Sequence, residues 1–424
     1  MKRAPNSQRY FSSNIEETNS KRFKDDSATN RLNNNSDILS INNYTSSFTH
    51  LASGNKITDE FAKSTKSIFD FYNLNVQSHD CFRRKIQLKD ALYHMFKHVF
   101  SYLGVYIVGS SANGFGTNQS DVDICLVISH EELDQKHEAV YILKMIAKGL
   151  RKASFIRNLS VISAKVPIIK FHDTHNDIEC DINLNNHIGI RNTHLLRCYS
   201  EQDWRVRPLV LSIKRWSDFH NINDASQQTL SSYSLTLMAI HYLQFVCKPP
   251  VLPVLQKLFP DKFNIENDVS NLKLNEELPI FTSQNTQTLG ELFSGYLDYF
   301  SNFNFEYSVI SVRTGTHIPK NCLPRDILEN DNYKFSQWKH ILIEEPFDLS
   351  NTARSVFDHY VFKQIVQVFK RSSKTIKETK SYDSLFNEKY YKPSSLTLDN
   401  SFNRRGGGGG GGGYKRDDYS SDDY

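Results

Sequence analysis

Apolar residues along the middle of the chain follow two different spacings, and the change of spacing predicts two kinds of structure. Between residues 105 and 184 most of them gather in short runs bounded by glycine or polar residues, which is typical of buried strands. From residue 205 to 247 they recur every three or four positions, as they do along the buried face of a helix. The predicted strands are 105–108, 121–128, 161–171 and 178–184.

Helical spacing also appears at 57–100, at 131–152 and at 356–380. The polar residues 172–176 separate the last two predicted strands, so we expect those strands to form a hairpin. Because strands and helices segregate along the chain, the simplest fold class is α+β, with a small mixed-sheet domain beside a helical domain.

These patterns divide the chain into four parts. We place the sheet domain at 57–200 and the helical domain at 201–385, and we expect the helix over 57–78 to pack on the helical domain. The ends lack the apolar residues that a core needs: residues 1–56 are rich in asparagine, serine and threonine, and residues 386–424 contain an uninterrupted glycine run. Such compositions predict disordered tails.

The overall composition narrows the class of protein. The 424 residues contain no apolar run long enough to span a membrane and no apolar stretch behind the basic N-terminus, so we expect neither a membrane anchor nor a secretory signal. The six cysteines lack zinc-binding spacing and are expected to be reduced thiols of an intracellular protein, in a cytoplasmic or nuclear compartment. A formal net charge of only +4 predicts a modest affinity for nucleic acid, or one that a partner supplies.

Three carboxylates stand out within the predicted strands. Residues i and i+2 of a strand point to the same side, so Asp121 and Asp123 share one face, and Asp181 joins them if its strand is a neighbour. Clustered carboxylates repel one another unless a cation neutralises them, and hard divalent cations with oxygen ligands do so. The alternative is an exposed acidic pair on an edge strand.

The loop before Asp121 supports the first interpretation. Gly109 ends one predicted strand, and Ser110 can cap a short helix whose first N–H groups would face a phosphate. The loop then leads the chain directly into the aspartate pair. A phosphate cradle beside a metal-binding pair predicts a site for a nucleoside triphosphate.

At this point the chain resembles a known family. Segment 109–127, GSSANGFGTNQSDVDICLV, is similar to the signature of the DNA polymerase β-like nucleotidyltransferases. Segments 180–193, 222–234 and 344–354 narrow the resemblance to the cytoplasmic poly(A) RNA polymerases of the germline-development type, which carry a PAP-associated domain. The similarity runs from about residue 58 to about residue 370. It implies a template-independent poly(A) RNA polymerase that adds AMP from ATP to RNA 3′ ends.

The resemblance also implies roles for individual residues. Asp121, Asp123 and Asp181 would hold Mg²⁺ or Mn²⁺, and Asp181 would also activate the RNA 3′-OH. The implied nucleotide-binding residues are Gly109, Ser110, Asn186, Thr193, Lys214, Ser232 and Tyr233, with Tyr233 stacking on the base. The implied base-selecting loop contains Asp348 and Asn351.

Two departures from wider relatives refine these implications. The position one helical turn after Lys214 is acidic, Asp218, where many relatives are basic, so we expect fewer triphosphate contacts. Relatives that prefer UTP carry a histidine shortly after the Pro-Phe-acidic segment, but here no histidine follows Asp348 until His359. The loop therefore resembles the branch that prefers ATP.

Other functions remain open at the level of sequence. A terminal uridylyltransferase would share every catalytic residue, a nuclear surveillance-type poly(A) polymerase would differ in localisation, and an inactive nucleotide-binding scaffold would have lost a carboxylate. No RNA-binding motif is evident, and the basic residues within 356–380 suit either an RNA path or a solvated face. The resemblance implies that a separate RNA-binding protein recruits the targets.

Overall fold

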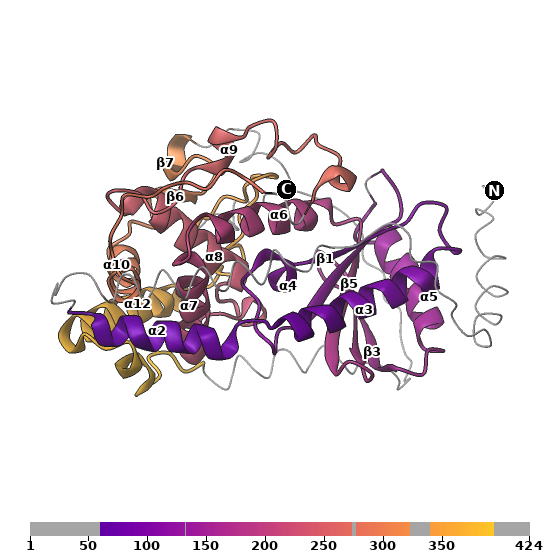
Figure 1. The fold of residues 1–424 in the computed structure, drawn as a ribbon, viewed down its shortest axis with the longest axis horizontal. Coiled ribbons are helices and arrows are strands. Elements are labelled where there is room, and N and C mark those ends of the chain that lie inside the picture. The colour runs from indigo at the N-terminus through magenta and orange to yellow at the C-terminus, as the bar shows by residue number, and fades with distance from the viewer. Residues whose placement is uncertain (1–59, 132, 274–276, 323–339, 394–424) are drawn as a thin grey trace, which may run out of the picture.

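The computed structural model describes residues 60–131, 133–273, 277–322 and 340–393. The predicted tail 1–56 and most of the predicted tail 386–424 lie outside these residues. Two large apolar clusters form the core, one around a sheet and one among helices, and the elements around them lie at opposite ends of the molecule in Figure 1. The α+β class and the mixed sheet beside a helical region are confirmed.

A five-stranded sheet has the strand order β1-β2-β5-β4-β3. Strands β2 and β5 run parallel, whereas the other neighbouring pairs are antiparallel, which makes the sheet mixed. The strand bounds are Gly104–Val108 for β1, Val122–Val127 for β2, Ile156–Ile162 for β3, Ile168–Asp173 for β4 and Ile178–Leu184 for β5.

One strand prediction was wrong in its extent. The segment 161–171 is not a single strand, because the chain turns at 163–167 and pairs β3 with β4. Pro167 lies between the two strands, where its missing N–H interrupts no ladder. The apolar residues on both sides of this turn hid it in the sequence pattern. The hairpin between the last two predicted strands is present as β4–β5.

Helices cover both faces of the sheet. Helices α3 (His79–Phe96) and α5 (Glu138–Leu150) pack on the face that carries Ile124 and Ile182. Helix α6 (His187–Gln202), which the pattern did not predict, lies against Val108 and Cys125 on the opposite face. Asp123 and Asp181 belong to the α6 face, because their positions alternate with Ile124 and Ile182.

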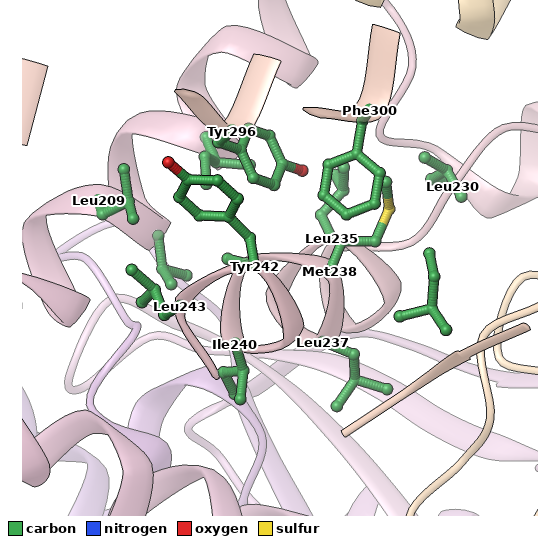
Figure 2. Packing of buried hydrophobic residues seen from close by; sticks show 14 of the residues in the cluster. Leu209, Leu230, Leu235, Leu237, Met238, Ile240, Tyr242, Leu243, Tyr296 and Phe300 are labelled. Carbon is green, nitrogen blue, oxygen red and sulfur yellow. The ribbon is translucent and has the colours of Figure 1, made fainter. Parts of the chain in front are cut away.

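The helical region is built on a second core. Its main helices are α2 (Ala62–Asn75), α7 (Val206–Phe219), α8 (Ser232–His241), α10 (Leu289–Ser301) and α12 (His359–Thr379). Figure 2 shows Tyr296 and Phe300 beside Leu235 and Met238 of α8. Helix α2 contacts α7 and α10 and inserts Ile68 into this core, so the N-terminal helix packs on the helical region.

Shorter elements complete the described part of the chain. The helical pattern predicted for 205–247 is interrupted between α7 and α8, and it ends in a π-helical turn at Tyr242–Val246. Further elements are α4 (Ser110–Asn113), α9 (Leu255–Leu258) and the hairpin of β6 (Ser308–Ser311) and β7 (Thr316–Pro319). Among the described residues, no helix has the length and apolar character needed to cross a membrane.

Candidate active site

The three predicted carboxylates come together on one face of the sheet. Strands β2 and β5 pair in parallel with Asp123 directly opposite Asp181, and Asp121 lies two residues before Asp123 on the same side. The Asp121 side chain is 46% exposed and the Asp181 side chain only 20%. The register of two neighbouring strands therefore produces the cluster that the sequence suggested.

The clustering is electrostatically unfavourable for the carboxylates. Burial, reinforced by the charges of Asp181 and Asp121, raises the pKa of Asp123 to about 7. Burial also raises the pKa of Asp181, although Lys170 opposes that shift. Burial is the first cause of both shifts, and a bound cation would oppose it by favouring the charged carboxylates.

Lys170 on β4 is a site residue that the sequence reasoning missed. It lies opposite Asp181 in the β4–β5 pair, and its Nζ donates a hydrogen bond to Asp121 Oδ2 at 3.0 Å. The same Nζ lies 3.4 Å from Asp181 Oδ1. The hairpin around 172–176 carried the signal, because extending its register from the turn places residue 170 opposite residue 181.

The donor chemistry of the cluster suits a hard divalent cation. Carboxylate oxygens are the ligands that Mg²⁺ and Mn²⁺ prefer, and Asp181 Oδ1 is a buried oxygen that accepts no hydrogen bond. Within the described parts of the chain, no three acidic, histidine or cysteine side chains converge closely enough to hold an ion. Asp121 Oδ2 instead faces the ammonium of Lys170.

The backbone of the glycine-bearing loop lies close to the Asp123 carboxylate at Gly109. Gly109 has φ +68°, and a Cβ on it would lie 2.4 Å from Asp123 Oδ2, so both the backbone conformation and the space require glycine. Ser110 begins the short helix α4 immediately afterwards. Thr193 Oγ1 accepts a hydrogen bond from Gly109 N at 2.9 Å and donates one to Gly189 O. Thr193 is buried and supports the loop, so its predicted contact with a nucleotide stays a prediction.

A second missed residue, Lys85 of α3, holds the loop between β1 and β2 through buried hydrogen bonds. Its side chain is fully buried, and Nζ donates hydrogen bonds to Gln77 Oε1, Ser111 Oγ and Ser120 O at 2.7–2.8 Å. Ser111 Oγ in turn donates to Asp121 O at 2.9 Å. The signal was a lysine within the buried stripe of α3, where the other positions are Cys81, Leu88, Leu92 and Phe96.

The helical region contributes a second group of predicted residues. Lys214 Nζ donates to Phe115 O at 3.1 Å, which links α7 to the loop of the sheet domain. Burial lowers the pKa of Lys214, against the opposing charges of Asp218 and Asp123. Lys214 therefore lies within electrostatic reach of the carboxylate cluster.

Ser232 and Tyr233 begin helix α8 and are held by neighbouring polar groups. Ser232 Oγ accepts a hydrogen bond from Asn223 Nδ2 at 3.0 Å. The Tyr233 hydroxyl donates a hydrogen bond to Glu345 Oε1 at 3.1 Å. Both residues are half-buried, so part of each side chain is accessible to a ligand.

The predicted base-selecting loop follows Glu345. Glu345 Oε2 accepts hydrogen bonds from the N–H groups of Phe347 and Asp348, at 2.7 and 2.5 Å. Asn351 is buried and supports the loop, because it accepts from Ile343 N and Ala353 N and donates to Ile341 O. Asp348 is only half-buried, and Oδ1 accepts a hydrogen bond from Ser350 N.

Asn186 and the turn between β3 and β4 complete the description of the site. Asn186 caps α6 by accepting a hydrogen bond from Gly189 N at 3.1 Å. Lys165 lies in the turn between β3 and β4; burial and the charge of Arg354 lower its pKa, and Asp348 opposes them. The tip of this hairpin is therefore near the loop 348–354, so the carboxylate face and the base-selecting loop belong to one region.

The fold and the carboxylate geometry define a nucleotidyltransferase of the DNA polymerase β-like class. The family model described as "Poly(A) RNA polymerase, mitochondrial-like, central palm domain" matches residues 65–201, and that described as "Cid1 family poly A polymerase" matches residues 288–351. The structure of a GLD-2/RNP-8 complex has a chain that is 40% identical, with a TM-score of 0.68 over 77% of this chain and 98% of that one. The chain belongs to the GLD-2 family of poly(A) RNA polymerases.

Two further comparisons show the breadth of the similarity. "Poly(A) RNA polymerase gld-2 homolog A" of Drosophila melanogaster is 41% identical over 324 residues, which cover 76% of this chain and 24% of the fly protein. The chain thus spans about a quarter of that relative. A structure of the Cid1 poly(U) polymerase is 29% identical, with a TM-score of 0.62 over 76% of this chain and 98% of that one.

Proposed function

We propose that this chain is a template-independent poly(A) RNA polymerase that transfers AMP from ATP to the 3′ end of RNA. The observation that carries the proposal is the strand register that sets Asp123 opposite Asp181 beside the Gly109 loop. This arrangement offers metal ligands and a phosphate-binding backbone at one place. The names of the similar proteins supply the reaction class.

The proposed reaction is an in-line attack of the RNA 3′-OH on the α-phosphate of ATP, with release of pyrophosphate. Asp121, Asp123 and Asp181 would hold Mg²⁺ or Mn²⁺, which when bound neutralise phosphate charge and make the attacking hydroxyl more acidic. Asp181 would orient the 3′-OH and receive its proton.

The rest of the site would orient the nucleotide. The backbone N–H groups at the start of α4 and the ammonium of Lys214 would contact the triphosphate, and Lys214 is already directed at the loop through Phe115 O. The ring of Tyr233 would stack on the base, with its orientation held by Glu345. These contacts position the reactants, which is a large part of catalysis in phosphoryl transfer.

The loop 348–354 supports ATP as the substrate. It reads Asp348-Leu-Ser-Asn-Thr-Ala-Arg354, so a histidine is absent from the sequence of this segment. Cid1 is named a poly(U) polymerase, with a described mechanism for UTP selectivity. Uridylyl transfer is the second candidate, because the carboxylates and Lys214 serve either nucleotide.

We also propose that a separate RNA-binding protein brings mRNA to this chain in the cytoplasm. The net charge of +4 is small for a protein that captures RNA by itself. The GLD-2 relative was solved in a complex with RNP-8. The exposed basic residues of α12 offer a supplementary path for RNA: Lys363, Lys370, Arg371 and Lys374.

The test is extension of a labelled oligo(A) RNA with each of the four nucleoside triphosphates, in Mg²⁺ and in Mn²⁺. We expect extension with ATP, and none from the double variant Asp121→Ala, Asp123→Ala. A preference for UTP would keep the chemistry and overturn the proposed base choice. Absence of extension, even with candidate RNA-binding partners added, would favour the scaffold interpretation.

A further inference from the structure

The position of Lys170 is fixed by the architecture of the sheet. In the register of β2, β5 and β4, Asp123, Asp181 and Lys170 form one row across three adjacent strands. Neighbouring strands lie about 4.8 Å apart, and the members of such a row project from the same face. The backbone therefore fixes the Cα of Lys170 beside the carboxylates, and a change of side-chain rotamer is what can move its ammonium toward or away from them.

Lys170 neutralises two carboxylates at the same time. Its Nζ is 3.0 Å from Asp121 Oδ2 and 3.4 Å from Asp181 Oδ1, and its side chain is 35% exposed. Burial lowers the pKa of Lys170, but the hydrogen bond to Asp121 and the charge of Asp181 outweigh it, so the net shift is upward. The group is thus a charged ammonium at neutral pH.

The same oxygens are the ones that a divalent cation needs. In the described residues no three potential ligands converge on a point, and Asp121 Oδ2 is directed at Lys170 Nζ. A divalent ion bound between Asp121 and Asp181 would lie within a few ångströms of a positive charge, and like charges at such a distance repel strongly. Lys170 and the ion therefore compete for one location.

Lys85, a second lysine near the cluster, is not a competitor. All three of its hydrogen bonds go to neutral oxygens, those of Gln77, Ser111 and Ser120, and its side chain is fully buried. It can leave neither its partners nor its position without breaking the loop. Among the lysines that the structure describes near the cluster, Lys170 combines contact with the carboxylates and a partly exposed side chain that can move, whereas Lys214 donates to Phe115 O.

We propose that Lys170 is a built-in counter-cation of the active site, which occupies the place of a divalent ion in the nucleotide-free chain and must release Asp121 when an ion binds. It stabilises the metal-free fold and weakens the binding of divalent ions until a triphosphate brings further negative charge. This proposal rests on the proposed function, which supplies the divalent ion. Its consequence is that metal and nucleotide bind the chain together more tightly than the affinity for metal alone suggests.

The test measures metal binding without nucleotide or RNA. Mn²⁺ is titrated into the nucleotide-free chain, and free Mn²⁺ is followed by electron paramagnetic resonance. Lys170→Met should lower the Kd for Mn²⁺ about tenfold, because it removes one positive charge next to the ion. Lys170→Arg keeps the charge and should retain the wild-type Kd. Lys144→Met removes an exposed lysine from α5, on the opposite face of the sheet, and should also bind as wild type.

A second readout is thermal unfolding in EDTA and in Mn²⁺. Lys170→Met should melt below wild type in EDTA and recover in Mn²⁺, whereas Lys144→Met should show neither change. If Lys170→Met does not fold, Lys170→Gln, which can still donate a hydrogen bond to Asp121, takes its place in both assays.

The outcomes separate this proposal from the proposed function. The variant Asp181→Asn should abolish Mn²⁺ binding at this site. It therefore shows which part of the measured Mn²⁺ binding occurs there. A Kd for Lys170→Met equal to or above that of wild type, with binding still abolished by Asp181→Asn, overturns the role of Lys170 and leaves the polymerase proposal intact. If neither wild type nor Lys170→Met has a Mn²⁺ site that Asp181→Asn removes, the nucleotide-free chain has no such site and the role of Lys170 is overturned, whereas the extension assay decides the polymerase proposal separately.

Discussion

The candidate site has two halves, the carboxylate cluster on the sheet and the loop around residues 345–354. They differ in how their polar and charged groups are satisfied. On the sheet, Asp123 has a pKa raised to about 7, and Asp181 Oδ1 is buried without a hydrogen bond. In the loop after β7, Asn351 makes three hydrogen bonds to the backbone, and Glu345 accepts three. In the first half, Lys170 is the ammonium that contacts the carboxylates, and Asp123 still has a strongly raised pKa. In the second half, the polar groups of Asn351 and Glu345 are satisfied by hydrogen bonds within the loop.

This difference separates the two tasks of the proposed enzyme. A carboxylate cluster with unmet negative charge binds cations and phosphate together, and its properties change with ions and pH. A loop with saturated hydrogen bonds keeps one shape, which a choice between nucleobases requires. Variants that change only one half of the site can therefore test whether the two halves differ in this way.

The largest expected effect is that of Asp123→Asn on the carboxylate half. Extension of RNA should fall about a hundredfold to a thousandfold, because one preorganised charged group is lost. In EDTA at pH 8, however, the free energy of unfolding should rise by about 1 kcal/mol or more, because burial disfavours the charged form of Asp123. Urea unfolding measures this gain.

The sign follows from proton linkage. The folded chain raises the pKa of Asp123 from 3.8 to about 7, so the folded state binds more protons between these values and its stability falls as pH rises through them. The gain from Asp123→Asn should therefore vanish near pH 4. A variant that is less stable than wild type at pH 8 would show that the carboxylate half is not strained.

The second effect concerns Lys85, which joins the loop to the sheet. Lys85→Met should cost about 3 kcal/mol of folding free energy, because the buried oxygens of Gln77, Ser111 and Ser120 lose their donor. It should also reduce extension of RNA, since Ser111 holds the backbone of Asp121. Chemical denaturation and the extension assay measure the two losses. Lys63→Met, on the exposed side of α2, is the control and should change stability by less than about 0.5 kcal/mol.

The site residues that the sequence predicted depend on local patterns, whereas the missed ones depend on contacts between distant segments. Asp121, Asp123 and Gly109 were predicted because strand alternation and a glycine-bearing loop are local patterns. Lys170 depends on the β4–β5 register, which a misplaced strand end at 161–171 concealed.

Other features were missed although a signal was present. Thr288 and Glu291 form a capping box at the start of α10, yet that helix was not predicted. Glu345 could not be singled out within the segment 344–354, because its hydrogen bond with Tyr233 joins residues more than a hundred positions apart. The sequence thus predicted that Asp121, Asp123 and Asp181 share one face of the sheet, whereas it did not reveal the contacts of Lys170, Lys85 and Glu345.

The third prediction tests whether the loop half is complete without ions. Burial and the charge of Asp348 raise the pKa of Glu345 from 4.5 to about 8, so folding stability should fall as pH rises from about 4.5 to about 8. Glu345→Gln should remove this part of the pH dependence, which amounts to roughly 1 kcal/mol for each pH unit between these two values. The amide oxygen can still accept from the Phe347 and Asp348 N–H groups, and the amide nitrogen can donate to Tyr233.

Urea unfolding of wild type and Glu345→Gln at pH 5 and pH 8 measures the difference. If the free energy of unfolding changes equally between pH 5 and pH 8 in the two proteins, the protonation of Glu345 is not coupled to folding. Extension with ATP should remain within about threefold of wild type for this variant, because the loop keeps its hydrogen bonds.

The smallest expected effect lies at the junction of the two halves. Asp218 is exposed, accepts a hydrogen bond from Asn223 at 2.7 Å and opposes the charge of Lys214. Asp218→Asn keeps an acceptor for Asn223, which also holds Ser232, and removes only the negative charge. We expect the KM for ATP to fall about twofold to threefold with kcat unchanged, because the charge of an exposed carboxylate is largely screened by water. Steady-state extension at low and high salt measures the change, which should shrink in high salt; a lower kcat at unchanged KM would instead make Asp218 a positioning residue of the Asn223–Ser232 pair.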